Sequence, residues 1–368
     1  LLSRGLGDVY KRQVYTVDLR QELQEGNRSI FSRKLQELMT DRLNKGQQTI
    51  LFLNRRGYAG FVSCRSCGEV MKCPHCDVSL SEHKGGRLIC HYCGYTQPMP
   101  KLCPKCGSKY ILGFKAGTQQ IEEKLKELYP GVRTLRMDAD TTRTKDSYEK
   151  ILSSFANGEA DVLIGTQMIV KGHDFPKVTL VGILAADLSL NASDYRAGER
   201  TFQLLTQAVG RAGRGVLPGE AVIQTYQPDH YAITCAAAQD YESFYQEEIL
   251  YRELSGYPPV AHMLAVQIYG KEEENVKQLA LRLTDVVKSN MDFLSGKQKE
   301  QSNKKIQVLG PAPANISKIN DIYRYVFYVK HAEYDVLVEV KDRLEETLRQ
   351  WQSRQMSIQF DFDPVSVL

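Results

Sequence analysis

Residues 161–184 read DVLIGTQMIVKGHDFPKVTLVGIL and place a polar, glycine-containing segment between two short apolar runs. The runs, 161–165 and 178–184, are typical of strands buried on both faces of a parallel sheet. Similar runs occur at 49–53, 132–137 and 220–225. Segments with helical spacing of apolar residues separate them, at 29–43, 119–128, 144–156 and 197–208. This alternation predicts a parallel α/β sheet.

The pattern changes after residue 228. Residues 228–253 are predicted to form one helical stretch, and Gly256-Tyr-Pro-Pro259 breaks the chain at a domain boundary. The expected order is then strand 263–269, helix 272–290, strands 306–310 and 322–330, helix 334–350 and strand 356–362. That βαββαβ order predicts a second, α+β domain of the ferredoxin-like kind.

Length and composition exclude several classes of protein. The chain has 368 residues, enough for two or three domains, and it is 42% hydrophobic and 25% charged, as globular proteins are. Its longest apolar stretch, 178–186, is far shorter than the roughly 18 residues of a membrane span. We therefore expect no membrane association, and the absence of a secretion signal predicts a cytoplasmic protein. The net charge of +4 does not by itself indicate a nucleic-acid partner.

Eight of the nine cysteines form four CxxC pairs between residues 64 and 106. In a reducing compartment such pairs are usually metal ligands, and four pairs predict two tetrahedral Cys₄ sites, with Zn²⁺ as the default metal. Both sites would be structural, because four sulfurs close the coordination shell. The pairs are Cys64/Cys67, Cys73/Cys76, Cys90/Cys93 and Cys103/Cys106.

Three pairings of these knuckles are open. We favour nesting, with the first and last pairs forming an outer site and the two middle pairs forming an inner site across a hairpin near residues 84–86. Redox-active cysteines and an iron–sulfur cluster are the alternatives. His75, His83 and His91 could substitute as ligands, but we expect them at the surface, and we expect Cys235 to be a small buried residue.

A second motif, Gln207-Ala-Val-Gly-Arg-Ala-Gly-Arg214, follows the helix expected at 197–208. It predicts Arg211 and Arg214 on one helical face, where small neighbours let a phosphate approach closely. Two such guanidinium groups suit a triphosphate. A solvated basic helix end is the alternative. The glycine and arginine spacing, together with the block 164–176, favours the phosphate interpretation.

These two blocks resemble motifs V and VI of superfamily 2 helicases. With the other motifs, the sequence is similar, from about residue 14 to 368, to the primosomal protein N′ (PriA) family of bacterial replication-restart DNA helicases. The further supporting stretches are 54–59, 117–118, 138–142, 190–191, 199–206, 224–230 and 257–259. The resemblance implies a RecA-like helicase lobe 2 that carries the Cys-rich double zinc-binding insertion, followed by the ferredoxin-like domain.

The resemblance also implies roles for single residues. Arg214 would be the arginine finger on the γ-phosphate of ATP, with Arg211 beside it and Gln207 orienting both. Such groups stabilise charge on the transferred phosphoryl group. Gly172 and Asp174 would face the ribose of ATP.

The implied DNA contacts are made by Thr166 and Lys171, on the single-strand backbone. The zinc module would help to open duplex DNA and contact partner proteins, and the C-terminal domain would contribute to binding of forked DNA. The implied partners are forked and single-stranded DNA, single-strand-binding protein, other primosome proteins and the loader of the replicative helicase. We expect a monomer.

The resemblance has two departures. Motif VI reads Gln-Ala-Val-Gly where the family more often has Gln-Val-Ala-Gly. No GxxxxGK[ST] loop and no Asp-Glu dipeptide occur in the sequence. The groups that hold ATP and Mg²⁺ would therefore lie upstream in lobe 1. We expect the chain to be a C-terminal fragment that is inactive alone.

The expected boundaries follow from these motifs. Residues 1–13 (LLSRGLGDVYKRQ) look like a non-native tail. The lobe would begin at 14–60, continue after the zinc insertion 61–113 at 114–228, and end in a helical linker at 229–258 before the C-terminal domain 259–368.

The predicted function of the complete protein is ATP-dependent 3′-to-5′ unwinding of DNA at stalled forks, with loading of the primosome. The alternative is a non-catalytic zinc-ribbon scaffold of the primosome that binds DNA or protein. A transcription-related zinc ribbon leaves Arg211 and Arg214 unexplained.

Overall fold

The computed structural model describes residues 12–53, 62–75, 78–83, 86–113, 117–138, 141–142, 145–166, 169, 175–191, 194–289, 306–349 and 356–365. The chain divides into two compact units. The first comprises Leu1–Glu69, Lys101–Asn191 and Ala197–Phe244, and the second comprises Val70–Pro100, Ala192–Arg196 and Tyr245–Leu368. Each unit is described by itself. None of the helices within the described residues is long and apolar enough to cross a membrane.

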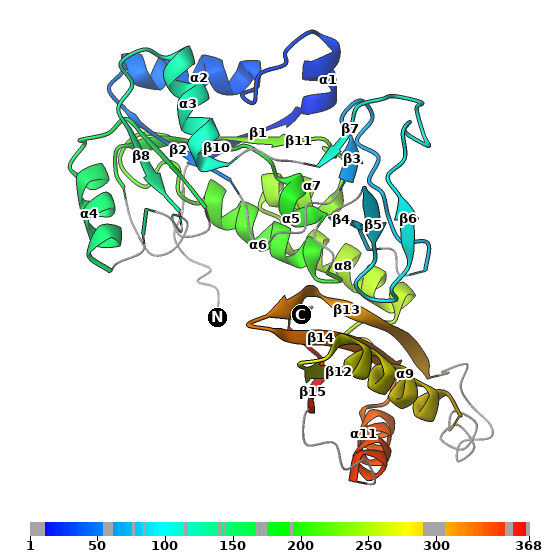
Figure 1. Cartoon of the computed structure of the whole chain (residues 1–368). Coiled ribbons are helices and arrows are strands. Elements are labelled where there is room, and N and C mark those ends of the chain that lie inside the picture. The colour runs from blue at the N-terminus through cyan, green and yellow to red at the C-terminus, as the bar shows by residue number, and fades with distance from the viewer. Residues whose placement is uncertain are drawn as a thin grey trace. The chain divides into compact units, whose positions relative to one another are not determined.

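The first unit is built on a six-stranded parallel sheet with the order β1-β11-β10-β2-β9-β8 (Figure 1). Every residue of β2 (Gln48–Phe52), β9 (Val162–Gly165) and β10 (Val178–Ile183) is buried. This burial on both faces confirms the expectation drawn from their apolar runs. The remaining strands are β1 (Gln13–Asp18), β8 (Thr134–Met137) and β11 (Glu220–Thr225).

Helices cover both faces of this sheet. Because side chains alternate along a strand, Leu51 and Leu53 pack with α2 (Arg33–Asn44) and α3 (Thr118–Leu128), whereas Ile50 and Phe52 face the opposite core. That core is completed by α4 (Lys145–Ala156), α6 (Ala197–Val209) and α7 (Tyr231–Ala238). A short helix, α5 (Asp187–Leu190), follows β10. Figure 1 shows α2 and α3 on one side of the strands and α6 and α7 on the other.

Two elements at the start of the first unit were not predicted. Strand β1 pairs with β11 at the edge of the sheet and begins at Gln13, the last residue of the segment set aside as a tail. Helix α1 (Leu19–Gln24) follows directly, with Asp18 as its N-cap. Both have six residues, and the strand is only partly buried, so neither carries a clear apolar pattern.

The single helical stretch expected at 228–253 was wrong. Helix α7 ends at Ala238, because the left-handed backbone of its C-cap, Gln239 (φ 56°), cannot continue an α-helix. Asp240 then accepts a hydrogen bond from the backbone N–H of Ser243 and caps the start of α8 (Tyr241–Ser255).

The second unit contains a four-stranded antiparallel sheet with the order β13-β14-β12-β15. Helices α9 (Glu273–Ser289) and α11 (Tyr334–Arg349) pack on one face of it. This order confirms the ferredoxin-like domain. Its strands are β12 (His262–Gly270), β13 (Gln307–Ile319), β14 (Ile322–His331) and β15 (Met356–Phe362). Strand β13 is longer than predicted, because it continues past two irregularities to the turn at Asn320 and Asp321.

The cysteine-rich segment contributes short strands to both units. In the first unit, β3 (Val62–Cys64) pairs with β7 (Ile111–Gly113). In the second unit, β4 (Ser81–His83), β5 (Arg87–Ile89) and β6 (Thr96–Pro98) form a three-stranded sheet.

Candidate metal centres and phosphate loop

The four cysteine knuckles share one backbone design. In each, the N–H of the first cysteine donates to the carbonyl of the residue five positions on, at 2.7–2.8 Å. In three of them a glycine after the second cysteine donates back to the first cysteine's carbonyl, and that glycine has a positive φ of 70–78°. Only glycine adopts that conformation at little cost, so the turn needs it. The three glycines are Gly68, Gly94 and Gly107.

The outer cluster brings together the sulfurs of Cys64, Cys67, Cys103 and Cys106, all within 4.8 Å of one another. The Sγ atoms of Cys64 and Cys106 are 3.6 Å apart, and those of Cys67 and Cys103 are 3.7 Å apart. A Zn–S bond of about 2.3 Å in tetrahedral geometry separates the sulfurs by about 3.8 Å. These spacings therefore fit a zinc tetrahedron and are far too long for disulfides.

The inner cluster brings together Cys73, Cys90 and Cys93, again within 4.8 Å, and the Cys73 and Cys93 sulfurs are 3.5 Å apart. Cys76, the fourth ligand expected here, lies outside the described residues. Both groupings are those of the nested arrangement. Cys235 is buried on α7 and belongs to neither cluster, as predicted.

The outer cluster is electrostatically suited to a cation. Burial raises the pKa of the Cys64 thiol, but backbone N–H groups of Cys67 and Ser66 outweigh that effect and lower the pKa to about 7. At Cys67, burial and the neighbouring sulfurs raise the pKa to about 12. One thiolate thus forms easily and further ones repel it, so four thiolates need a bound cation.

The expectation that His91 is a surface residue was wrong. Only 1% of His91 is exposed, and its Nδ1–H donates to the carbonyl of Pro313 at 3.1 Å. Its Nε2 lies 3.0 Å from Nε2 of His83. Burial lowers the pKa of His91 more than the bond to Pro313 raises it. The sequence carried no signal for this contact, because Pro313 lies more than 200 residues further along the chain.

The outer cluster is attached to the carboxyl end of β11 in the same unit. A Cβ atom on Gly68 would lie 2.5 Å from the backbone oxygen of Tyr226, and the Arg65 guanidinium lies 4.9 Å from the centre of the Tyr226 ring. The Tyr226 N–H in turn donates to the buried carboxylate of Asp187. The knuckle therefore rests on a fixed part of the sheet.

This attachment predicts different effects for two matched substitutions. Gly107 has a positive φ of 70°, close to the 77° of Gly68, but nothing lies within 4 Å of a Cβ atom built on it. Gly107→Ala should therefore cost only the conformational term, about 1–2 kcal/mol. Gly68→Ala adds a clash with a backbone carbonyl, so it should lower the unfolding free energy clearly more in thermal or urea unfolding of the zinc-loaded chain. Equal losses would show that the contact with Tyr226 is not tight.

Several motif residues meet at the carboxyl ends of the parallel strands. Thr118 Oγ1 donates to Oδ2 of the buried Asp138 at 2.6 Å, which joins the stretches 117–118 and 138–142. Thr166 follows β9, and its N–H donates to the carbonyl of Met137 at 3.3 Å. Thr166 thus lies at this edge, beside Asp138.

The motif VI arginines lie in a turn, so the prediction of a shared helical face was wrong. Helix α6 ends at Val209, and Gly213 then adopts a φ of +65° that stops helical continuation. The Gly213 N–H donates to the carbonyl of Val178, the first residue of β10. Arg211 and Arg214 therefore lie at the amino ends of the strands, opposite to Thr166.

The loop that carries Arg214 packs tightly against other backbone segments at the glycines before and after the arginine. A Cβ atom on Gly213 would lie 2.4 Å from the nitrogen of Gly219, and one on Gly215 would lie 2.5 Å from the oxygen of Pro176. Arg214 itself is exposed, and its Nε donates to the carbonyl of Gly210 at 2.9 Å. The packing holds the backbone of an exposed guanidinium in one place, next to the end of motif V.

Gln207 lies exposed on α6. Lys171, Gly172 and Asp174 lie outside the described residues.

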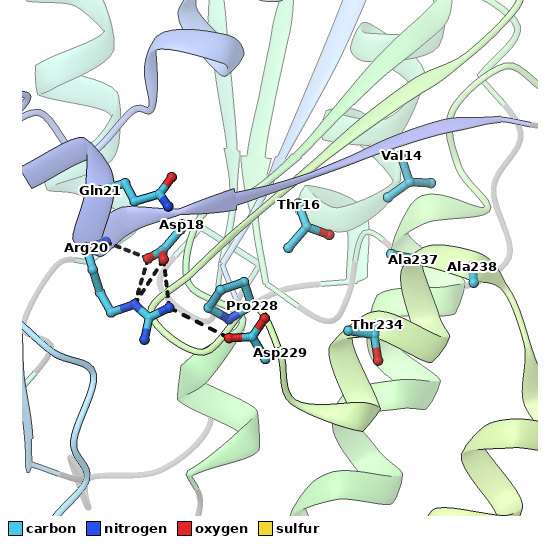
Figure 2. A pocket seen from close by; sticks show the side chains of 10 residues that line it. All are labelled: Val14, Thr16, Asp18, Arg20, Gln21, Pro228, Asp229, Thr234, Ala237 and Ala238. Carbon is cyan, nitrogen blue, oxygen red and sulfur yellow. Dashed lines mark hydrogen bonds and ion pairs between the residues drawn. The ribbon is translucent and has the colours of Figure 1, made fainter. Parts of the chain in front are cut away.

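A cleft of about 640 Å³ in the first unit contains none of the predicted site residues. It lies along β1 and is closed by α7 and by Pro228 and Asp229 (Figure 2). Its charges are paired internally, because Arg20 binds Asp18 at 2.7 Å and lies 3.9 Å from Asp229. Burial would raise the pKa of Asp18, but hydrogen bonds from the Arg20 side chain and N–H hold it below its ordinary value.

Three family models match the chain. Residues 102–216 match the helicase conserved C-terminal domain, 73–98 match the Cys-rich region of PriA DNA helicase, and 253–365 match the C-terminal domain of primosomal protein N.

Curated relatives match nearly the whole chain. It is 44% identical over 358 residues to the replication restart protein PriA of Bacillus subtilis, covering 97% of this chain and 43% of the relative. It is 42% identical to PriA of Synechocystis sp., covering 96% and 41%, and 34% identical to PriA of Haemophilus influenzae, covering 99% and 48%. The chain thus spans less than half the length of these relatives.

Among solved structures, S. cerevisiae Dbp5 bound to RNA and ADP BeF3 is 12% identical, with a TM-score of 0.31 over 66% of this chain and 45% of that chain. We draw nothing further from a likeness of that size. The family models and the curated relatives agree on one assignment. The chain belongs to the PriA family of replication restart proteins, and its matches fall on the C-terminal helicase domain, the Cys-rich region and the C-terminal domain.

Proposed function

We propose that this chain supplies the second ATPase lobe, the zinc module and the C-terminal domain of a replication-restart helicase. The complete protein would unwind DNA 3′-to-5′ at stalled forks at the expense of ATP and load the primosome. The observation that carries the proposal is the loop of Arg214. Its backbone is fixed by Gly213 and Gly215 while its guanidinium remains exposed, as a group that acts on an incoming phosphate requires.

Each predicted site residue has a role in this proposal. Arg214 stabilises charge on the γ-phosphate of ATP, with Arg211 beside it and Gln207 orienting both. Gly172 and Asp174 contact the ribose. Thr166 and Lys171 bind the backbone of single-stranded DNA, and Thr166 lies at the strand edge opposite to the arginines. Because these two groups of residues are separated, the contacts with DNA are independent of the contacts with the phosphates of ATP.

The cysteines would hold two structural zinc ions. Cys64, Cys67, Cys103 and Cys106 form one site, and Cys73, Cys90 and Cys93, with Cys76, form the other. Zinc would supply charge neutralisation and cross-linking of the knuckles, and no open coordination position for catalysis.

The family resemblance supports a proposal for the partners and the location of the protein. The proposed partners are forked and single-stranded DNA, single-strand-binding protein, other primosome proteins and the loader of the replicative helicase. We propose a monomer that works in the cytoplasm, divided at the boundaries expected from the sequence, with ATP and Mg²⁺ bound through a lobe that precedes this chain.

The test is ATP hydrolysis by two proteins. We expect no DNA-stimulated hydrolysis by the zinc-loaded chain alone, because its sequence has neither a GxxxxGK[ST] loop nor an Asp-Glu dipeptide to hold Mg²⁺. A protein of the relatives' full length should hydrolyse ATP when single-stranded DNA is added. Hydrolysis by the chain alone would overturn the division of the site, and no hydrolysis by the longer protein would favour the scaffold function.

A further inference from the structure

The three knuckles that contain glycine differ in what packs against them. A Cβ atom on Gly68 would lie 2.5 Å from the backbone oxygen of Tyr226, and one on Gly94 would lie 3.4 Å from that of Pro311. A Cβ atom on Gly107 would have nothing within 4 Å. Of these three knuckles, the one at 103–107 is therefore open to solvent at its turn.

The same knuckle carries an exposed metal ligand. Of the seven clustered cysteines that the structure describes, Cys106 alone is exposed, and the others are buried or half-buried. In the outer cluster, Cys64 and Cys103 beside it are only 0% and 3% exposed. A reagent that approaches from solvent therefore reaches this cluster first at Cys106.

The charge of the outer cluster favours such an attack. Four thiolates and one Zn²⁺ give a net charge of about −2. The two CxxC pairs of this cluster contain one cation each, Arg65 and Lys105, and both are engaged elsewhere. The Arg65 guanidinium lies 4.9 Å from the centre of the Tyr226 ring, and Lys105 Nζ lies 3.3 Å from a carboxylate oxygen of Glu69. The negative charge stays on the sulfurs, and the thiolate is the nucleophilic form of cysteine.

The two outer knuckles are joined by protein contacts as well as by their shared metal site. Strands β3 and β7, at their bases, pair antiparallel, and the hydroxyls of Ser66 and Ser108 lie 2.8 Å apart. The Sγ atoms of Cys64 and Cys106 lie 3.6 Å apart across the two knuckles. Side-chain rotation can bring them to the S–S bond length of about 2.05 Å while the strands keep their pairing.

We propose that Cys106 is a modification site, at which electrophiles and two-electron oxidants attack the outer cluster, and that Cys64 completes a disulfide that releases the outer zinc. The inference rests on the zinc occupancy in the proposed function and on no contact with ATP or DNA. It gives the two clusters different chemistry, because the inner cluster has no exposed sulfur among its described cysteines.

The reaction with a diazene oxidant such as diamide shows the balance. The Cys106 thiolate adds to the N=N bond, and an S–N bond forms. The Cys64 thiolate then attacks the Cys106 sulfur, so the S–S bond forms and the S–N bond breaks. The two sulfurs lose two electrons, which reduce the diazene, and the nitrogens take up two protons and leave as a hydrazine. The outer site thereby loses two of its four ligands.

The experiment treats the zinc-loaded chain with diamide and follows released zinc with a chromogenic chelator. The ratio of zinc to chain should fall from about two to about one and pause there, because only the outer site opens. Peptide mass spectrometry at that point should find Cys106 bridged to Cys64, with Cys73 and Cys90 still reduced. A dithiol reductant with added zinc should restore the ratio, since a disulfide is reducible and a sulfinic acid is not.

Cys106→His removes the exposed thiolate and retains a ligand, because Cys₃His is an ordinary structural zinc set. This variant should hold about two zinc ions before treatment and keep both at the dose that empties the outer site of the wild type. Cys235→Ser, at a buried cysteine outside both clusters, is the matched control and should lose zinc as the wild type does. Substoichiometric N-ethylmaleimide gives a second measurement on the unaltered chain and should label Cys106 before any other clustered cysteine.

Three results would overturn the proposal: release from the inner cluster first, labelling that begins at a buried cysteine, or zinc loss from Cys106→His at the rate of the wild type. A bridge from Cys106 to Cys103 would overturn the assignment of Cys64. A starting ratio near one in the wild type would instead contradict the zinc assignment itself, so the two failures are distinct.

Discussion

Arg214→Ala in a protein of the relatives' full length is expected to lower kcat for DNA-stimulated ATP hydrolysis by about 10³- to 10⁵-fold. The guanidinium would meet the γ-phosphate only when the two lobes close, so its loss falls mainly on the transition state. The loop makes this a clean experiment, because Gly213 and Gly215 fix the backbone and the removed side chain is exposed. Steady-state kinetics and DNA affinity, measured on the same preparation, separate the two effects.

Two further variants define the outcome. Arg214→Lys should restore little activity, because an ammonium group lacks the planar fork of donors. Lys171→Ala should instead weaken DNA binding, with a salt dependence that is shallower by about one unit of slope. If Arg214→Ala weakened DNA binding and spared hydrolysis, the residue would belong to a basic nucleic-acid surface rather than to the ATP site.

Removal of zinc is the second large effect. Structural zinc contributes about 10–16 kcal/mol in small cysteine sites, more than the whole stability of most domains. Metal analysis of the chain purified under reducing conditions should give two zinc ions, and a strong chelator should unfold both cysteine clusters. A ratio near one, or a coloured sample containing iron, would contradict the two-zinc assignment.

Substitution of a single cysteine should release one of the two zinc ions and disturb mainly the unit that holds it. Cys73→Ser should reduce the ratio to about one and disturb the second unit first, while the parallel sheet of the first unit stays folded. Cys64→Ser should reduce the ratio equally but loosen the knuckle that rests on Tyr226. Cys235→Ser, at a buried cysteine outside both clusters, is the control and should keep two zinc ions. Far-ultraviolet circular dichroism follows the folding of each variant.

The parts of the fold that local chemistry determines could be predicted from the sequence. Strand β11 and strand β15 lie where their apolar patterns placed them. The features that escaped prediction depend on distant residues. His91 is buried because Pro313 accepts its hydrogen bond.

The candidate phosphate site shows the same limit. The spacing of Arg211 and Arg214 matches helical periodicity and therefore predicts one shared helical face. The helix ends before it reaches the arginines, because two glycines and a hydrogen bond to Val178 turn the chain away. The residue types were sufficient to propose the chemistry. The geometry required the backbone contacts with Pro176 and Gly219, which no pattern around the arginines contains.

The division of the cysteine clusters has a practical consequence. The outer cluster belongs to the unit with the parallel sheet, whereas Cys73, Cys90 and Cys93 belong to the unit with the antiparallel sheet. Replacing zinc by cobalt would therefore put one spectroscopic label on each body without any engineered cysteine. In a protein of the relatives' full length, the separation of the two paramagnetic ions, followed through a cycle of nucleotide binding, would report directly whether the bodies move as one piece or independently.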